Sequence, residues 1–178
     1  MTELNQPLDD QLREIKRRLR AAMNGVLSGT MRKNGVDYRV NFGVDQPRLA
    51  EIATEIPHTY ELAAALWKED IRELRLLAIM TMPQSDFDEE LAMLWMEQLR
   101  YAEEAQVLVL HLLQHRPYAS SMAFRLISSE VLIQRLVGWL LLGRLFMAGL
   151  HPTQRDADEL LDQVATELSA PEGDVGVK

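Results

Sequence analysis

Apolar positions recur at three- and four-residue steps along most of the chain, the spacing that gathers them on one face of an α-helix. The first predicted helix runs from about Leu8 to Val26 and has an apolar stripe and a basic opposite face. Gly29, Asn34 and Gly35 then interrupt the pattern, so residues 36–43 are predicted to form an extended connection. Because no segment shows the strict alternation of a half-buried strand, the pattern predicts an all-α protein.

Capping residues and helix breakers divide the rest of the chain into short helices. We predict helices over about 46–56, 60–68, 71–82, 87–99, 103–115, 118–127, 130–147 and 153–169. Several of their starts are marked by Asp45, by Asp70 with Glu73, by Asp86 with Glu89, by Ser129, and by Thr153 with Asp156. The connections are too short for anything but antiparallel packing, and alternate helices restart roughly every 30 residues. The predicted architecture is a HEAT-like (armadillo-type) stack of antiparallel helix pairs, an α-α superhelix, with an irregular helical bundle as the alternative.

The length of 178 residues suits one domain with a substantial core. We predict a single helical domain over residues 1–169, in which residues 1–28 contain the basic amphipathic first helix. Residues 170–178 are predicted to be a disordered tail. The predicted helix over 130–147 is apolar nearly all round, so we expect other helices to cover it on several sides.

Composition excludes several classes of site. The chain has no cysteine, which excludes disulfides, zinc–thiolate sites, iron–sulfur clusters and cysteine nucleophiles. His111 and His115 stand four residues apart without a third ligand in the pattern, so we interpret the pair as coincidence and expect no metal. No glycine-rich phosphate loop is present and no cofactor is expected. The uncharged apolar run over residues 136–143 is too short to span a membrane, and no signal segment begins the chain; we therefore expect a cytoplasmic protein.

The net charge of −8 is unevenly distributed. Residues 1–40 hold eight Lys and Arg against five Asp and Glu, whereas residues 41–178 hold eleven against twenty-two. An acidic total argues against strong non-specific affinity for DNA, but it leaves room for a local basic surface. The candidates for phosphate contact in the first helix are Arg13, Lys16, Arg17 and Arg20. The alternative is a solvated helix face.

Three stretches, taken in order, resemble the bacterial DNA alkylation repair family, whose HEAT-like members include N-alkylpurine DNA glycosylases. The first is Phe42-Gly43-Val44, followed by Pro47, Leu49, Ile52 and Ala53. The second is Leu66-Trp67, followed by the run Arg72-Glu73-Leu74-Arg75-Leu76-Leu77-Ala78. The third is Ile133-Gln134-Arg135, which opens a long apolar helix containing Trp139. Together they span residues 40–148.

The resemblance implies a curved stack of helix pairs whose concave face lines a groove for duplex DNA. Catalytic members of the family hold a damaged nucleotide with an acid, an arginine and aromatic side chains. The arginine that matches this role is Arg135, whose planar guanidinium could clamp a phosphate. Arg72, Arg75 and Tyr101 are further candidate DNA contacts. Ion pairs within the protein are the alternative for the arginines.

The sequence departs from the family pattern at the position of the essential catalytic acid. Catalytic members present two adjacent aromatics, an acid, two further residues and then the essential acid. Here Glu103 fits the first acid, but Gln106 stands at the essential position and Ala102 replaces an aromatic. Glu103 and Glu104 are the remaining candidate catalytic acids, because a neutral amide cannot stabilise the positive charge that develops on the sugar.

Two functions follow as hypotheses. The first is a DNA alkylation repair-type protein that binds damaged duplex DNA in a concave groove, with excision doubtful because of Gln106. If the protein is an enzyme, the resemblance implies a DNA glycosylase acting on alkylated purines. The second is a non-enzymatic HEAT-like scaffold that holds a protein partner in the same groove. The sequence leaves the lesion, the partner and the oligomeric state open.

Overall fold

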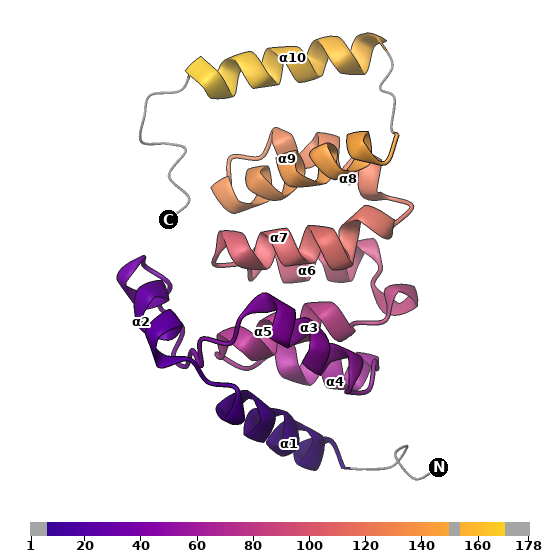
Figure 1. The fold of residues 1–178 in the computed structure, drawn as a ribbon. Coiled ribbons are helices and arrows are strands. Elements are labelled where there is room, and N and C mark those ends of the chain that lie inside the picture. The colour runs from indigo at the N-terminus through magenta and orange to yellow at the C-terminus, as the bar shows by residue number, and fades with distance from the viewer. Residues whose placement is uncertain (1–6, 150–153, 170–178) are drawn as a thin grey trace. The chain divides into compact units, whose positions relative to one another are not determined.

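The computed structural model describes residues 7–149 and 154–169, and these ranges are predominantly helical (Figure 1). The α-helices are α1 (Leu8–Ala21), α2 (Gly25–Lys33), α3 (Gln46–Thr54), α4 (Tyr60–Trp67), α5 (Arg72–Thr81), α6 (Glu89–Glu97), α7 (Ala102–His111), α8 (Ala119–Ile127), α9 (Leu132–Met147) and α10 (Gln154–Ser169). Two short 3₁₀ helices are η1 (Gln84–Asp86) and η2 (Leu113–His115). Within the described ranges the only β-type pairing is an isolated parallel bridge between Val40 and Ile71. The predicted all-α class is confirmed.

The chain divides into two compact units, residues 1–87 (unit 1) and residues 88–178 (unit 2). The single domain over residues 1–169 therefore stays a prediction. The predicted tail over residues 170–178 and the predicted cap at Thr153 lie outside the described residues.

Helix α5 is the centre of unit 1. Every residue from Ile71 to Ile79 is buried, and α5 packs against α3 and α4. Helix α1 packs against α4 and buries Ile15 and Leu19, the middle of its predicted apolar stripe. The hydrophobic effect of this burial holds the basic helix on the unit while its other side faces solvent.

The predicted first helix is wrong at its C-terminal end. Helix α1 stops at Ala21, and Asn24 starts a second helix by accepting the backbone N–H groups of Val26 and Leu27, both at 3.1 Å. A side-chain cap of this kind satisfies donors that have no partner inside the helix. The weak helix formers Gly25 and Gly29 conceal α2 in the hydrophobic pattern.

Two predicted capping boxes are also wrong. Helix α5 begins after Ile71 rather than after Asp70, because Glu73 binds another part of unit 1. Helix α6 is capped by Asp88, whose carboxylate accepts the N–H of Leu91 at 2.8 Å, and not by Asp86. The predicted cap at Asp45 of α3 is confirmed.

Helix α9 is the centre of unit 2 and packs against α7 and α8. Gly138 permits the close approach of α8, since a Cβ at this position would lie 2.7 Å from the backbone nitrogen of Ile127. Val137, Leu141 and Leu142 are buried, whereas most of the other apolar residues of α9 are half-buried or exposed. The expected cover on several sides is therefore only partial. Helix α7 ends at His111, so the predicted helix over 103–115 is wrong in its last turn.

Candidate functional site

The cations of α1 proposed for DNA binding are partly neutralised by neighbouring acids. Arg13 pairs with Asp10 at 2.6 Å, and its side chain is 77% exposed. Lys16 pairs with Glu69 at 2.9 Å, and about a quarter of each side chain is exposed. Exposed ion pairs contribute little to stability, so Arg13 can exchange Asp10 for a phosphate more readily than Lys16 can exchange Glu69.

Arg17 belongs to a small network centred on Glu14. The Glu14 carboxylate accepts hydrogen bonds from Arg17 at 2.7 Å and from Arg18 at 3.1 Å. Arg18 also reaches Glu55 of unit 1 at 2.8 Å. The hydrogen bond from Arg17, followed by that from Arg18, lowers the pKa of Glu14 to about 2. The carboxylate therefore stays ionised at neutral pH and offsets part of the positive charge of α1.

A group of exposed basic residues lies at the end of α1, in α2 and shortly after α2. Arg20, Arg32, Lys33 and Arg39 are exposed, and none of them forms an ion pair with any other described residue. The sequence analysis identified Arg20 but missed the other three. The count of eight Lys and Arg in residues 1–40 was the signal that could have found them.

Arg72, a predicted DNA contact, is inside unit 1. Its side chain is 1% exposed, and Nη1 lies 2.9 Å from Oε1 of Glu73. The same nitrogen donates to the carbonyl of Val44 at 2.8 Å. A phosphate contact needs an accessible guanidinium, so the burial of Arg72 supports a structural position and not the predicted DNA contact. The alternative ion pair with Glu73 is confirmed.

The Glu73 carboxylate holds the turn that carries the Phe42-Gly43-Val44 motif. Its oxygens accept the backbone N–H groups of Phe42 at 3.1 Å, Gly43 at 2.9 Å and Val44 at 3.3 Å. Glu73 has no exposed surface, and a buried carboxylate requires such donors to be tolerated. Two of the stretches that carried the family resemblance therefore form one buried structure.

Arg75, the second predicted contact on α5, is also buried. Its guanidinium carbon lies 3.8 Å from the centroid of the Trp67 ring, and Nη1 donates to the Trp67 carbonyl at 3.3 Å. This stacking is a cation–π interaction that fixes the turn between α4 and α5. Only 6% of Arg75 is exposed, so its geometry supports packing and not the predicted DNA contact.

Glu104, a candidate catalytic acid in unit 2, is fully buried. Its carboxylate accepts the backbone N–H of Arg100 at 2.7 Å, just before α7 begins. This contact closes the N-terminus of α7 in the manner of a capping side chain. The geometry thus gives Glu104 a structural position with no surface to offer to a substrate.

Glu103 and Gln106 lie one turn apart on α7. Glu103 is half-buried and Gln106 is exposed. Residues three apart on a helix share a face, so a carboxylate at 103 can reach much the same space as a side chain at 106. Of the two acids in the first turn of α7, Glu103 alone has an accessible side chain.

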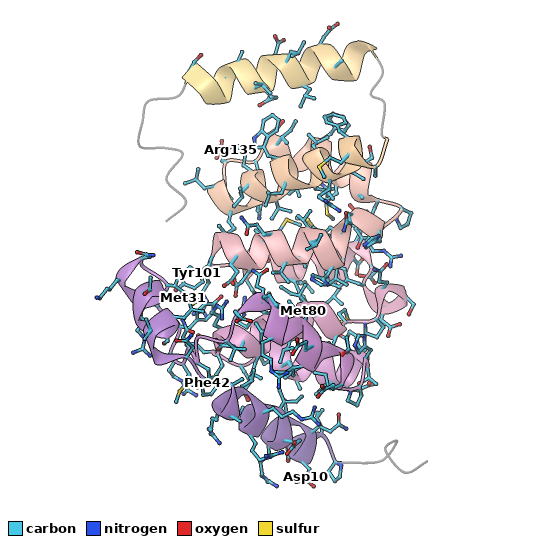
Figure 2. All side chains as sticks on the ribbon, viewed as in Figure 1. Asp10, Met31, Phe42, Met80, Tyr101 and Arg135 are labelled. Atoms are coloured by element: carbon cyan, nitrogen blue, oxygen red, sulfur yellow. The ribbon has the colours of Figure 1, made fainter. Side chains whose placement is uncertain are left out.

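Arg135 and Tyr101 lie where two neighbouring helices begin. Figure 2 shows both residues at the same end of the packed helices α7 and α9. Arg135 is half-buried and donates from Nη1 to the carbonyl of Ser129 at 2.9 Å. The first turn of α9 carries no acidic residue. A helix N-terminus and a guanidinium together favour an anion at this end of unit 2.

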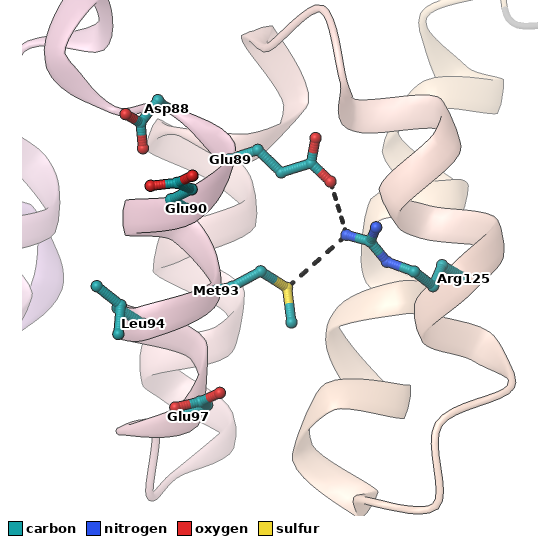
Figure 3. Close-up of a pocket in the computed structure, with 7 residues that line it drawn as sticks. All are labelled: Asp88, Glu89, Glu90, Met93, Leu94, Glu97 and Arg125. Carbon is teal, nitrogen blue, oxygen red and sulfur yellow. Dashed lines mark hydrogen bonds and ion pairs between the residues drawn. The ribbon is translucent and has the colours of Figure 1, made fainter.

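A separate acidic groove lies between α6 and α8 of unit 2 (Figure 3). It encloses about 1000 Å³ and is lined by Asp88, Glu89, Glu90, Met93, Leu94, Glu97 and Arg125. Arg125 pairs with Glu89 at 2.7 Å, which leaves three carboxylates to set the charge of the groove. Leu94 is 55% exposed. The lining combines two apolar side chains with an excess of carboxylates, and this negative charge repels phosphate.

No other class of site is evident in the described ranges. Among those residues, no three His, Asp or Glu side chains gather in a way that could hold a metal ion. None of the described helices is both long and apolar enough to cross a membrane.

Comparison with known proteins agrees with the fold and with the ordered motifs. Residues 15–174 match the family described as DNA alkylation repair enzyme. The fold is similar to a solved structure from a new family of proteins related to the HEAT-like repeat DNA glycosylases with affinity for branched DNA structures. That similarity has a TM-score of 0.77 at 17% sequence identity and covers 92% of this chain and 70% of the other. No curated protein matches the sequence significantly. The predicted HEAT-like architecture is confirmed.

Proposed function

Because this chain belongs to the DNA alkylation repair enzyme family, we propose that it is a DNA-binding protein that recognises distorted duplexes and excises alkylated bases slowly or not at all. The observation that carries the binding proposal is the group of exposed cations without acidic partners among the described residues 20–39: Arg20, Arg32, Lys33 and Arg39. Phosphate contacts by such residues release counterions and supply most non-specific affinity for DNA.

The distribution of charge supports placing the electrostatic contact in unit 1. By sequence, unit 2 holds seven Lys and Arg against fourteen Asp and Glu, whereas unit 1 holds twelve against thirteen. Two cations of unit 1, Arg72 and Arg75, are buried. The positive surface is therefore concentrated in residues 13–39, and Arg13, Lys16 and Arg17 add to it when a phosphate displaces their acids.

The preference for distorted DNA is supported by the structural relative, whose family is described as having affinity for branched DNA structures. Low sequence identity limits that similarity to the fold, so the ligand is part of our proposal. A protein with few exposed cations gains little binding energy to bend a regular duplex. It therefore binds more readily to DNA that is already bent or unstacked, because less energy is spent on deforming that DNA.

In unit 2 we assign a phosphate contact to Arg135 and a base or sugar contact to Tyr101. Both stand at the shared end of α7 and α9. The arginine keeps part of its surface exposed while its bond to the Ser129 carbonyl limits its freedom. A pre-oriented planar guanidinium loses less entropy when it binds a phosphate.

The proposal that base excision is slow or absent rests on the carboxylates of α7. Gln106 is exposed and neutral, and Glu104 is buried against the backbone. Glu103 is the remaining candidate, at a position one turn earlier. A displaced acid stabilises the developing charge poorly, because electrostatic stabilisation depends on donors and acceptors placed in advance of the reaction.

Fluorescence anisotropy with a labelled duplex tests the binding proposal. We expect measurable affinity at low ionic strength and a steep loss as salt rises. Binding that is undetectable in low salt, to both linear and branched DNA, would overturn the proposal.

The acidic groove favours a second candidate function, a protein-interaction scaffold. Its lining includes Asp88, Glu90 and Glu97 together with the exposed Leu94, which suits a basic partner segment with an apolar side chain. In that case variants such as Glu90→Lys and Glu97→Lys abolish capture of the partner and leave DNA affinity unchanged or improved.

A further inference from the structure

Helix α2 projects from the packed helices of unit 1 (Figure 1). Several of its apolar and basic residues are exposed. Val26 is 83% exposed and Met23, just before the helix, is 61% exposed. Val26, Thr30 and Lys33 follow at helical spacing and are all exposed, so they form one outward stripe. Large exposed apolar side chains beside cations indicate an interaction surface when they recur on one face.

We define the α2 face as Arg20, Met23, Val26 and Lys33. The cations flank the apolar pair on both sides along the chain. Lys33 lies seven residues, or roughly 10 Å along the helix axis, beyond Val26. The opposite side of α2 faces unit 1, where Ser28 is buried.

The position of α2 is fixed by close contacts at its N-terminus. The N–H of Asn24 donates to the carbonyl of Phe42 at 2.9 Å, and the Ser28 hydroxyl donates to the carbonyl of Asn41 at 2.8 Å. Gly43 has a φ of +71°, and a Cβ there would lie 2.2 Å from the Asn24 carbonyl oxygen. Only glycine allows the turn to approach α2 this closely.

The turn at residues 42–44 is held by Arg72 and Glu73, the buried ion pair of α5. Glu73 binds the N–H groups of residues 42–44, and Arg72 holds both Glu73 and the Val44 carbonyl. A chain of contacts therefore runs from the core of unit 1 to a short, exposed helix. These contacts keep the α2 face in one orientation relative to the core of unit 1.

We propose that the α2 face binds DNA at a branch point or other interruption of base stacking, with Met23 and Val26 against exposed bases and the cations on the flanking phosphates. The inference rests on the proposed DNA binding and names the surface that discriminates between structures. Charge favours a polyanion, since the α2 face carries two cations and no acid. Apolar side chains gain little binding energy from contact with the sugar–phosphate surface of a continuous duplex. They gain more where two neighbouring bases are unstacked, because the side chains can then contact the exposed base faces.

The test compares an immobile three-way junction with a linear duplex of the same length and composition. The variant Met23→Ser with Val26→Ser loses about tenfold in affinity for the junction and less than twofold for the duplex, as expected when buried apolar contacts are removed. The matched control, Leu110→Ser with Met147→Ser, alters two exposed apolar residues of unit 2 and changes neither affinity. Circular dichroism and melting temperature verify that both variants fold.

The cations are tested separately. Arg20→Ala with Lys33→Ala lowers affinity for both DNA forms and reduces the salt slope by about two, because two phosphate contacts are lost. Lys68→Ala, at an exposed cation of unit 1 that has no ion pair with a described residue, is the control.

Two results would overturn the inference. The first is a folded Met23→Ser, Val26→Ser variant that binds the junction as the wild type does. The second is unchanged DNA binding by that variant together with lost binding to vesicles of anionic phospholipid, which would assign the α2 face to a membrane surface. Absence of wild-type binding to either DNA would instead overturn the proposed function itself.

Discussion

The Glu73 carboxylate accepts the backbone N–H of Gly43 at 2.9 Å across 30 residues of sequence. Both residues lie in motifs that resemble the repair family, and both are buried. The bond turns a stretch of unpaired backbone donors into a fixed loop against α2. The fold therefore explains the motif, because the buried carboxylate holds the loop that supports α2.

Removal of this carboxylate should be severe. We expect Glu73→Ala to lower the free energy of unfolding by about 3–5 kcal/mol, because it removes the carboxylate paired with the buried Arg72 and leaves the backbone N–H groups of residues 42–44 without their acceptor. Urea unfolding followed by circular dichroism measures the loss. The control, Glu51→Ala, breaks an exposed pair with Arg48 and should leave the unfolding midpoint nearly unchanged. Equal midpoints for the two variants would contradict the assigned role.

Charge reversal should distinguish paired from unpaired cations in α1. Arg20→Glu should weaken duplex binding more than Arg13→Glu, because Arg13 is already neutralised by Asp10 and Arg20 has no ion pair with a described residue. Reversal of Arg13, Lys16, Arg17 and Arg20 together should reduce binding sharply. Anisotropy titrations at several salt concentrations provide the comparison. A larger effect of Arg13 than of Arg20 would show that the pair with Asp10 does not persist in solution.

Arg135 offers a test that separates binding from stability. As a phosphate contact, Arg135→Ala should lower DNA affinity and reduce the salt slope by about one. Loss of its bond to the Ser129 carbonyl should cost only about 1 kcal/mol of unfolding free energy. The clamp would be excluded by a large drop in melting temperature with unchanged DNA affinity.

Stability should fall in mild acid because of His111. Burial, followed by the charge of His115, lowers the pKa of His111 below its usual value of 6.5. The folded state then binds fewer protons than the unfolded state. The stabilising contribution is fully present above pH 6.5 and is lost as the pH falls through the lower folded-state pKa. Melting temperatures from pH 8 to 5 should show a smaller decline in His111→Gln than in the wild type, and an identical decline would refute this cause.

Excision of alkylated bases should be slow in the wild type. Loss of one placed electrostatic stabiliser commonly costs about 100- to 1000-fold in rate, and Ala102 removes an aromatic contact as well. A single-turnover assay on a duplex with one N-methylpurine measures the rate, with Glu103→Gln and Gln106→Asp alongside. Activity that appears only with Gln106→Asp would confirm a DNA-binding site that lacks its carboxylate.

The opposite result is equally informative. Fast wild-type excision that disappears in Glu103→Gln would refute the prediction and identify Glu103 as the acid. Glu104→Gln is unsuitable as a catalytic control, because Glu104 is buried at the start of α7 and its change should affect folding.

The sequence alone determined the fold class and most of the helices. Apolar spacing and local caps act over three or four residues, so α3, α4 and α8 could be predicted close to their true limits. The order of the motifs determined the family. Helix α2 escaped because its glycines weaken the helical pattern and its cap, Asn24, lies inside the span predicted for the first helix.

Only the tertiary structure decided which charged residues face solvent. Arg72 and Arg20 look equally suited to a phosphate in the sequence, yet one is buried against Glu73 and the other is exposed. The difference arises from partners far away in the chain, such as the Val44 carbonyl that accepts from Arg72 across 28 residues. A local sequence pattern carries no information about such distant partners. A charged side chain can be buried only where such partners compensate for its lost hydration, so these partners decide whether the side chain is buried or exposed.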